Sequence, residues 1–185
     1  GYMQYDVRKV KMAAPLNILM SGSAFVYYGE EIGMTGSGKD ENKRAPMYWS
    51  SDAQAKGMTR GPLDMEPQEN QFACAQEQMK ADDSIYSFYK DTILLRNQNP
   101  EIARGTVARL EEVEDQDIAA VSKTYDGKTI YLLYNISETE EKQVEMPASL
   151  YGELEIAGYL SVDGGEVTMK DGVVVLPSYS VVVLR

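Results

Sequence analysis

Asp40 and Arg44 are the two side chains whose types and spacing could act together on a ligand. The Arg guanidinium presents a planar fork of donors that suits a carboxylate or the neighbouring hydroxyls of a sugar, and an Asp carboxylate accepts hydrogen bonds from such hydroxyls. Four residues apart in a loop, the two side chains can equally form an ion pair that only holds the loop. From position alone the ion pair is the simpler interpretation, and a ligand role stays open.

Two further features could carry chemistry, and each has a structural alternative. Glu30 and Glu31 are adjacent carboxylates, and paired carboxylates do acid–base work when burial separates their pKa values. Adjacent side chains usually point apart, however, and Glu is favoured in the first turn of a helix. Trp49 could stack on a sugar ring, but a partly buried packing role is more common for Trp. We expect structural roles for all three residues.

The glycine-rich stretch Gly33–Lys39 comes close to a phosphate-binding loop, because it fits the pattern G-x-x-x-x-G-K. Asp40 stands where this pattern needs Ser or Thr, and it would place negative charge against a phosphate. No periodic helix follows, and Pro46 comes instead, so no aligned backbone amides would face a phosphate. We therefore predict a flexible loop here and not a nucleotide site.

Composition excludes several classes of function. The 185 residues include 18 Lys and Arg against 29 Asp and Glu, and the formal net charge is −11. Nucleic acid is excluded as a partner, because phosphate binding needs a basic face. The chain has no His, which removes Ser-His-Asp catalysis and His-ligated zinc. No apolar run reaches the roughly 18 residues that a membrane helix needs.

Two isolated signals carry little weight. The single cysteine, Cys74, excludes a disulfide framework and a Cys-based metal cluster, and we expect it to be an inert, partly buried thiol. Asn135-Ile136-Ser137 matches a glycosylation sequon, but the pattern is too common to be informative.

The first hundred residues mix helical patterns with long loops. Residues 5–20 have apolar side chains at helical spacing, and Pro15 should kink or break that helix. Residues 24–28 form a short apolar run, the pattern of a strand buried on both faces of a parallel sheet. A second helix is expected over 84–98, capped within 82–84.

A domain boundary is expected near Arg104-Gly105, giving domains 1–104 and 105–185. Residues 1–100 carry 11 basic and 13 acidic side chains, whereas residues 101–185 carry 7 and 16. At the same point, apolar residues begin to alternate with polar ones in short runs.

The short alternating runs of the second domain predict an antiparallel β-sandwich with Greek-key crossings. Tyr125-Asp126-Gly127-Lys128 predicts a two-residue hairpin turn, because Asp-Gly tolerates the positive φ angles of a type I′ turn. The expected strands lie near 106–112, 117–124, 128–135, 141–146, 153–160, 166–169, 172–176 and 179–184.

The segment Phe25–Ser50 resembles the alpha-amylase family of glycoside hydrolases, family 13, and especially its neopullulanase-like and oligo-glucosidase-like members. The phrase AFVYYGEEIGM, followed after a gap by DENKRAPMYWS, is similar to the eighth barrel strand and the loop after it. KVKMAAPLNILMSG resembles the seventh barrel helix, and SIYSFYKDTILLRNQNPEIARG resembles the eighth. The resemblance implies a C-terminal piece of a (β/α)8 barrel, with helix 7, strand 8 and helix 8, followed by a Greek-key β-sandwich.

The family resemblance also implies a chemistry: retaining hydrolysis of α-1,4 or α-1,6 glucosidic bonds in starch or maltooligosaccharides, through a covalent intermediate on a carboxylate. The three family carboxylates lie at the ends of barrel strands four, five and seven, the last in an Asn-His-Asp motif. Because this chain has no His, that motif is absent. The resemblance therefore implies that no catalytic residue lies in this chain and that the isolated chain is inactive.

The resemblance carries a sugar-binding role onto Asp40 and Arg44, which would line the subsites nearest the cleaved bond. The match departs at Glu41, where some members have Pro, so the path of this loop can differ. No metal site and no cofactor is expected in this chain, while calcium in the full enzyme and the cellular location stay open.

A barrel piece alone would leave strand edges unpaired and an apolar face bare. We therefore expect Phe25–Tyr28 to be a buried strand whose neighbours come partly from the remainder of the catalytic barrel or from self-association. The alternative function is a non-catalytic carbohydrate-binding or interaction β-sandwich, which an exposed aromatic row would favour. The candidates for that row are Tyr125, Tyr131, Tyr134, Tyr151, Tyr159 and Tyr179.

Overall fold

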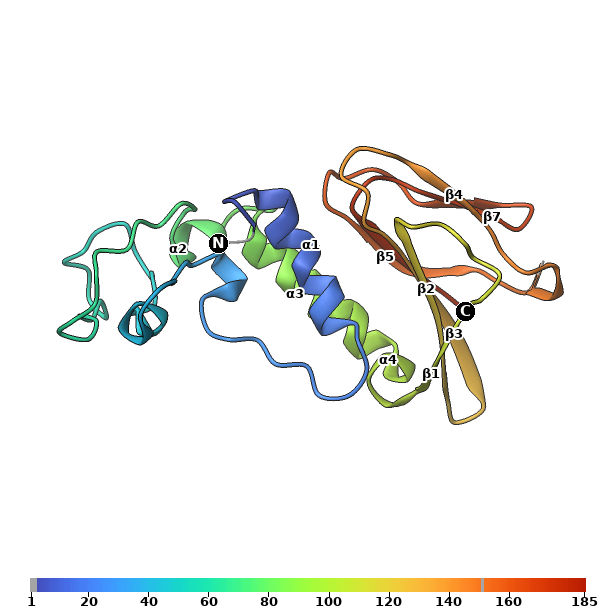
Figure 1. Ribbon diagram of the computed structural model, residues 1–185, viewed down its shortest axis with the longest axis horizontal. Helices are drawn as coiled ribbons and strands as arrows, with labels where there is room; N and C mark the ends of the chain where they lie inside the picture. The colour runs from blue at the N-terminus through green and yellow to red at the C-terminus, as the bar shows by residue number, and fades with distance from the viewer. Residues whose placement is uncertain (1–2, 151) are drawn as a thin grey trace. The chain divides into compact units, whose positions relative to one another are not determined.

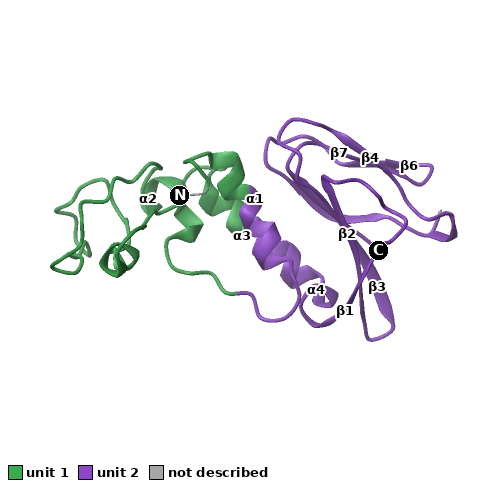
Figure 2. Ribbon diagram, in the orientation of Figure 1, with its two compact units in different colours: residues 1–11, 25–90 green, residues 12–24, 91–185 purple. Residues whose placement is uncertain are grey.

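The computed structural model describes residues 3–150 and 152–185 (Figure 1). The chain divides into two compact units, one with residues up to 11 and 25–90 and the other with residues 12–24 and 91–185 (Figure 2). The helical elements are α1 (Val7–Ile18), the 3-10 helices η1 (Glu30–Ile32) and η2 (Asp40–Arg44), α2 (Ala75–Gln78), α3 (Ile85–Gln98), α4 (Pro100–Arg104) and the 3-10 helix η3 (Ala148–Leu150).

Both long helices lie where the sequence pattern predicts them. Pro15 lies inside α1 without ending it, so the expected break does not occur. The N–H of Leu19 still donates to the carbonyl of Pro15 at 3.0 Å, because a proline in the last turn removes only its own donor. At the start of α3, Ser84 and Ser87 exchange hydrogen bonds: Ser87 N–H donates to Ser84 Oγ at 3.0 Å, and Ser84 N–H donates to Ser87 Oγ at 2.8 Å. This reciprocal cap fixes the first turn.

The predicted buried strand at Phe25–Tyr28 is wrong for this chain. Residues 25–27 have no regular secondary structure and Tyr28 begins a turn, so none of them belongs to either sheet of the described structure. The Phe25 side chain is 81% exposed. A strand needs neighbours to satisfy its backbone donors and acceptors. None of the described residues before 106 forms a strand, so this apolar run has no sheet to join.

All eight predicted strands are present, in two antiparallel sheets. Their bounds are β1 (Thr106–Arg109), β2 (Ile118–Tyr125), β3 (Lys128–Asn135), β4 (Lys142–Glu145), β5 (Ile156–Ser161), β6 (Thr168–Lys170), β7 (Val173–Leu176) and β8 (Ser180–Leu184). One sheet has the order β1-β2-β3-β8-β5 and the other β4-β7-β6, so the chain passes repeatedly between sheets before β8 pairs with β3. Figure 1 shows β4 and β7 stacked over the sheet of β2, β3 and β5.

The hairpin turn between β2 and β3 forms as predicted. Asp126 and Gly127 have φ angles of 51° and 73°, and Tyr125 pairs with Lys128 across the turn. The sandwich core then takes apolar side chains from both sheets, among them Leu133, Val144, Val174, Leu176, Val182 and Leu184. Alternation along the strands places these side chains inside, which stabilises the pairing register.

Arg96 of α3 anchors the end of α1. Its guanidinium donates to the carbonyls of Ile18 at 2.5 Å, Met20 at 2.8 Å and Gly22. The last carbonyls of a helix lack partners within the helix, and a cation at that end is favoured by the helix dipole. One side chain therefore satisfies three carbonyls of the segment that leaves α1.

Lys123 of β2 reaches the same region from the sandwich. Its side chain is 1% exposed, and the ammonium donates to the carbonyls of Leu19 at 2.7 Å and Ile102 at 3.1 Å. Burial, and secondly the charge of Arg96, lower the pKa of Lys123 to about 8. A buried lysine thus links the end of α1 and the middle of α4 to the sheet.

Candidate functional site

Asp40 and Arg44 lie at the two ends of η2 and form the ion pair that their spacing suggested. Arg44 Nη2 is 3.0 Å from Asp40 Oδ2 and 3.5 Å from Glu41 Oε1. The Asp40 and Arg44 side chains are 74% and 53% exposed, so the pair leaves donors and acceptors free to meet a ligand. Exposed ion pairs contribute little stability, so these groups can exchange partners at small cost.

Two tyrosines from the Phe25–Tyr28 segment hold the backbone on either side of Arg44. The hydroxyl of Tyr28 donates to the carbonyl of Ala45 at 2.9 Å, and that of Tyr27 donates to the carbonyl of Lys43 at 3.5 Å. Their rings are tilted and lie 4.8 Å apart between centroids. Desolvation, followed by the effect of Tyr27, raises the pKa of Tyr28, so its hydroxyl remains a donor.

Asn42 lies in the middle of η2 and is the site residue that sequence reasoning missed. Its side chain is 2% exposed. Nδ2 donates to the carbonyl of Ser37 and to Glu66 Oε2, each at 2.8 Å, and Oδ1 accepts from Glu66 N–H at 3.0 Å. A single polar residue in a loop has no periodic signal; the nearby glycines were the only hint of a close backbone approach.

The stretch Gly33–Lys39 is tied down, in contrast to the flexible loop that was expected. A Cβ on Gly36 would lie 2.4 Å from the carbonyl oxygen of Asn42, so the backbone approaches too closely for any other residue. Lys39 Nζ lies 3.4 Å from Glu66 Oε1. The helix that follows is a 3-10 helix of five residues, which offers no dipole axis for a phosphate.

Glu30 and Glu31 have the structural roles that were expected. Both lie in η1, where Glu31 Oε2 accepts from Gly29 N–H at 2.7 Å and Glu30 Oε2 accepts from Tyr27 N–H at 3.3 Å. These two hydrogen bonds stabilise the turn that follows Tyr27 and Tyr28. Trp49 is 48% exposed, and its backbone carbonyl accepts from Gln76 N–H at 3.1 Å, which links it to α2.

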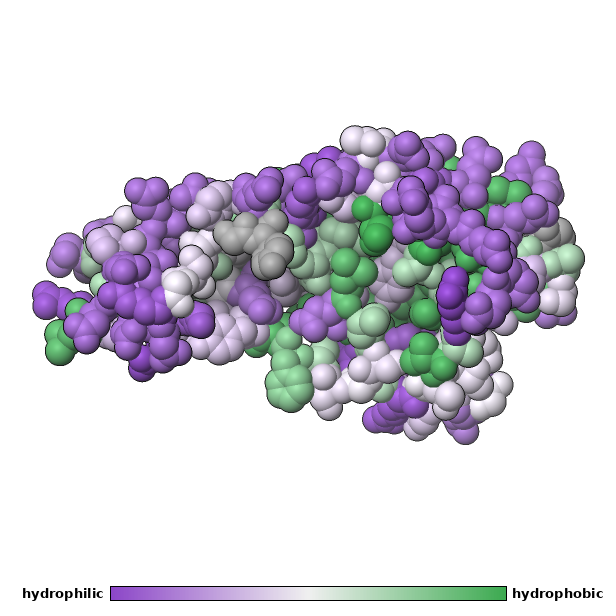
Figure 3. Space-filling model, in the orientation of Figure 1, coloured by the Kyte–Doolittle hydropathy of each residue, from purple (hydrophilic) through white to green (hydrophobic). Residues whose placement is uncertain are grey.

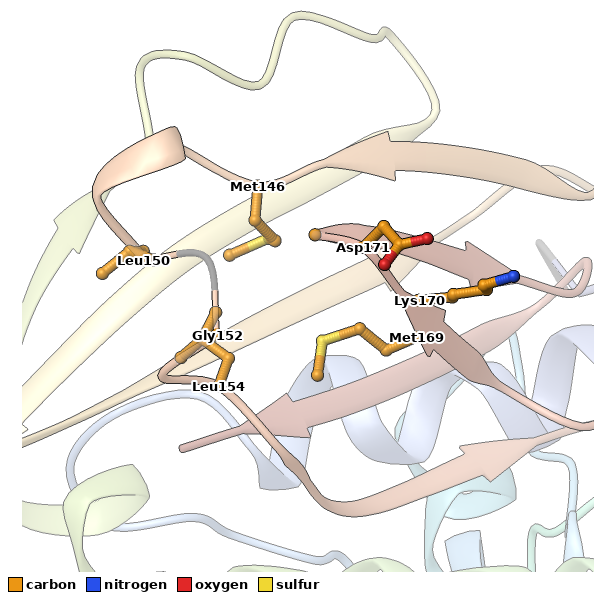
Figure 4. A pocket seen from close by; sticks show the side chains of 8 residues that line it. Met146, Leu150, Gly152, Leu154, Met169, Lys170 and Asp171 are labelled. Atoms are coloured by element: carbon orange, nitrogen blue, oxygen red, sulfur yellow. The ribbon is translucent and has the colours of Figure 1, made fainter.

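The sandwich carries a cavity of about 510 Å³, lined mainly by apolar side chains (Figure 4). Met146 and Met169 line it together with Leu150 and Leu154, while Lys170 and Asp171 lie at the β6–β7 turn. The Lys170 ammonium points away from the two methionines in Figure 4. The lining residues include only one carboxylate, so they provide no acid–base pair.

The sandwich tyrosines do not form an exposed row. Tyr134 and Tyr179 are buried, Tyr125 and Tyr131 are half-buried, and Tyr159 is exposed; Tyr151 lies outside the described residues. The feature that would have favoured a separate carbohydrate-binding module is therefore missing among the described tyrosines.

The two weak sequence signals are both buried. Cys74 is 1% exposed, and Asn135 is fully buried. Asn135 Nδ2 donates to the carbonyls of Glu140, Leu176 and Pro177 at 2.8, 3.0 and 2.9 Å. The sequon asparagine is thus a structural residue.

No group of three or more His, Cys, Asp or Glu side chains could hold a metal ion in the part of the chain that the structure describes. Within residues 3–150 and 152–185, none of the helices is long and apolar enough to cross a membrane.

Known proteins resemble this chain over most of its length. Residues 1–105 match the sequence family described as "Alpha amylase, catalytic domain". Alpha-amylase 3 of Dictyoglomus thermophilum is 27% identical over 135 residues, which are 73% of this chain and 27% of that protein. The cyclomaltodextrinase of Geobacillus thermopakistaniensis is 30% identical over 147 residues, 80% of this chain and 20% of that protein. This chain therefore spans about a quarter or less of these relatives.

A solved structure, "Eubacterium rectale Amy13B", has a TM-score of 0.90 and 42% identity over 96% of this chain and 34% of its own. The alpha-amylase from H. orenii has a TM-score of 0.73 and 25% identity over 97% of this chain and 35% of its own. The family match covers more than half of the residues and the fold agrees with both structures. The chain belongs to the alpha-amylase family of glycoside hydrolases.

Proposed function

We propose that this chain is the C-terminal part of a retaining α-glucan hydrolase, which cleaves α-1,4 or α-1,6 glucosidic bonds in starch or maltooligosaccharides. The observation that carries the proposal is the family match over residues 1–105. The names of the relatives support the substrate class, because they include a cyclomaltodextrinase and an oligo-1,6-glucosidase. In this proposal residues 1–104 are part of the catalytic barrel, and residues 105–185 are its C-terminal sandwich.

The reacting carboxylates would come from the part of the barrel that this chain does not include. A retaining glycosidase needs one carboxylate as nucleophile and another as acid and base. The acidic side chains of η1 and η2 are engaged in caps and an exposed ion pair, and the chain has no His to build the family's Asn-His-Asp motif. We therefore expect the isolated chain to be inactive.

Asp40 and Arg44 would bind the sugar rather than react with it. Arg44 can donate to ring hydroxyls while Asp40 accepts from them, and both groups remain exposed on a turn held by Tyr27, Tyr28 and Asn42. A binding role of this kind positions the glucan without taking part in bond cleavage.

The remainder of the catalytic barrel is the proposed partner. The first unit leaves large apolar side chains on its surface, among them Phe25, Val26, Leu63 and Met79. Hydrophobic side chains also interrupt the hydrophilic surface on the face drawn in Figure 3. Apolar surface of this kind marks an interface, and the missing barrel strands would cover Phe25–Tyr28 and pair with its backbone.

The proposal is tested by grafting this chain onto Eubacterium rectale Amy13B in place of the matching third of that protein. The isolated chain should release no sugar from maltooligosaccharides, whereas the graft should regain hydrolysis. Turnover by the isolated chain would contradict the proposed absence of catalytic carboxylates. A folded graft without activity would contradict the proposed place of this chain in the enzyme.

The roles of the two site residues are tested in the same graft. Asp40→Asn and Arg44→Lys should each raise KM about tenfold with little change in kcat, which corresponds to about 1.4 kcal/mol of binding. Lys43→Gln is the matched control, because Lys43 is exposed on the same turn. An unchanged KM in both site variants would remove Asp40 and Arg44 from the proposed subsite.

A further inference from the structure

We propose that Asn42, held by Glu66, is a positioning residue that sets the turn carrying Asp40 and Arg44 for contact with the sugar. This inference rests on the proposed function for its ligand, but the geometry behind it does not. It assigns a role to the glycine-rich stretch and to Glu66, which the proposed function leaves unused.

Asn42 lies between the two binding groups along the chain. It lies two residues after Asp40 and two before Arg44 in the single 3-10 helix η2. Its side chain is almost fully buried, whereas those of Asp40 and Arg44 are mostly exposed. The turn therefore has one inward-facing anchor between two outward-facing charged groups.

Several hydrogen bonds hold the side chain of Asn42. The Asn42 amide makes three hydrogen bonds of 2.8 to 3.0 Å, one to the carbonyl of Ser37 and two to Glu66. Of the two bonds to Glu66, one goes to its side-chain carboxylate and the other comes from its backbone N–H. The Asn42 amide therefore binds Glu66 at two points. A buried amide satisfied in this way has one favoured orientation, and it fixes the backbone that carries it.

The carboxylate of Glu66 faces Asn42. Glu66 Oε2 accepts a hydrogen bond from Asn42 Nδ2. Its other oxygen, Oε1, lies 3.4 Å from Nζ of Lys39, the residue directly before η2. One exposed carboxylate thus holds the residue before the turn and the residue at its centre. Hydrogen bonding from Asn42, and secondly the charge of Lys39, lower the pKa of Glu66, so the carboxylate stays ionised near neutral pH.

The glycine-rich stretch Gly33–Lys39 packs closely against Asn42. Gly36 lies against the carbonyl oxygen of Asn42, where a Cβ would be only 2.4 Å away, and Gly38 has a φ of 78°. Asn42 is therefore enclosed by the loop on one side and by Glu66 on the other. The three polypeptide segments meet at this amide and leave the turn little freedom to reorient Arg44.

The first test measures the turn itself, in the 185-residue chain and without any sugar. Trypsin can cut after Lys39, Lys43 and Arg44, and cleavage requires the turn to open. Asn42→Ala should speed cleavage at these bonds at least tenfold, and Glu66→Ala should also speed it. Glu66→Gln keeps an acceptor for Asn42 and should have a smaller effect. Glu69→Ala, an exposed carboxylate on the same segment, is the matched control.

The second test measures the sugar contact, in the graft onto Amy13B. Asn42→Ala should raise KM about tenfold with kcat nearly unchanged, and Glu66→Gln should preserve most of the affinity. If Asn42 acts through Arg44, the double variant with Arg44→Ala should have the KM of Arg44→Ala alone. A merely structural role would instead give effects on KM that multiply.

The outcomes separate this inference from the proposed function. Unchanged proteolysis in Asn42→Ala would overturn the inference whatever the activity. Faster proteolysis with an unchanged KM would overturn the positioning role, provided that Arg44→Ala raises KM. If Arg44→Ala itself leaves KM unchanged, the proposed subsite is wrong, and the positioning role falls with it. Far-UV circular dichroism checks that each variant folds. If Asn42→Ala does not fold, Glu66→Ala, which removes the carboxylate that accepts from Asn42, keeps the test open.

Discussion

Lys123 should make the sandwich more stable in moderately alkaline solution than at neutral pH. The ammonium is buried against the carbonyls of Leu19 and Ile102, and burial with the charge of Arg96 lowers its pKa from 10.5 to about 8. In the unfolded chain the same group keeps its ordinary pKa. At pH values between about 8 and 10.5, the unfolded state binds more protons than the folded state. The free energy of unfolding therefore rises as pH rises.

The size of the effect follows from the two pKa values. The lowering of the Lys123 pKa from 10.5 to about 8 corresponds to about 3 kcal/mol over the full range of pH. Between about pH 7.5 and about pH 9.5 the expected gain is about 2 kcal/mol, because the titration is then only partly complete. Burial raises the pKa values of Tyr89 and Tyr134, so their ionisation in the unfolded chain lowers stability above about pH 10. The pH range in which the gain from Lys123 can be measured therefore ends at about pH 10.

Urea unfolding followed by far-UV circular dichroism measures this gain, since the only tryptophan, Trp49, lies in the other unit. Lys123→Met should abolish the rise in stability between the two pH values. Lys128→Met, at an exposed position of the neighbouring strand, should preserve it. The reasoning is refuted if the unaltered chain shows no rise in this window, or if Lys123→Met shows the same rise as the unaltered chain.

Two further variants probe single buried contacts. Asn135→Ala should lower the free energy of unfolding of the sandwich by about 3 kcal/mol, because it leaves three carbonyls without their donor. Urea unfolding measures this loss, with Ser122→Ala as the control. A loss below about 1 kcal/mol would contradict the hydrogen bonds described for Asn135. Ser84→Ala should cost about 1 kcal/mol through loss of the α3 cap, visible as a lower urea midpoint in Trp49 fluorescence. An equal or higher midpoint would mean that the cap does not stabilise α3.

Local signals predicted the sandwich and the long helices well. The Asp126-Gly127 turn forms because Asp-Gly tolerates positive φ, and the α3 cap forms because a Ser before the first turn accepts from a free N–H. These features depend on residues close together in the sequence, so one sequence is enough to predict them.

Features that depend on distant partners could not be predicted in the same way. The apolar run Phe25–Tyr28 has the composition of a buried strand, but pairing needs neighbours that no described segment provides. Its exposure counts against the barrel-strand part of the alpha-amylase resemblance, while the match of residues 1–105 shows the family itself. Lys123 and Asn42 are polar residues without periodic neighbours, and their burial depends on carbonyls and a carboxylate elsewhere in the chain.

The anchoring of α1 has a consequence for the order in which the protein is made. The carbonyls at the end of α1 bind Arg96, 78 residues beyond Ile18, and Lys123, 104 residues beyond Leu19. A ribosome adds residues at roughly 5–20 per second, so the end of α1 waits several seconds for the cations that secure it. During that interval the end of α1 lacks these donors and depends on contacts with residues that are already made.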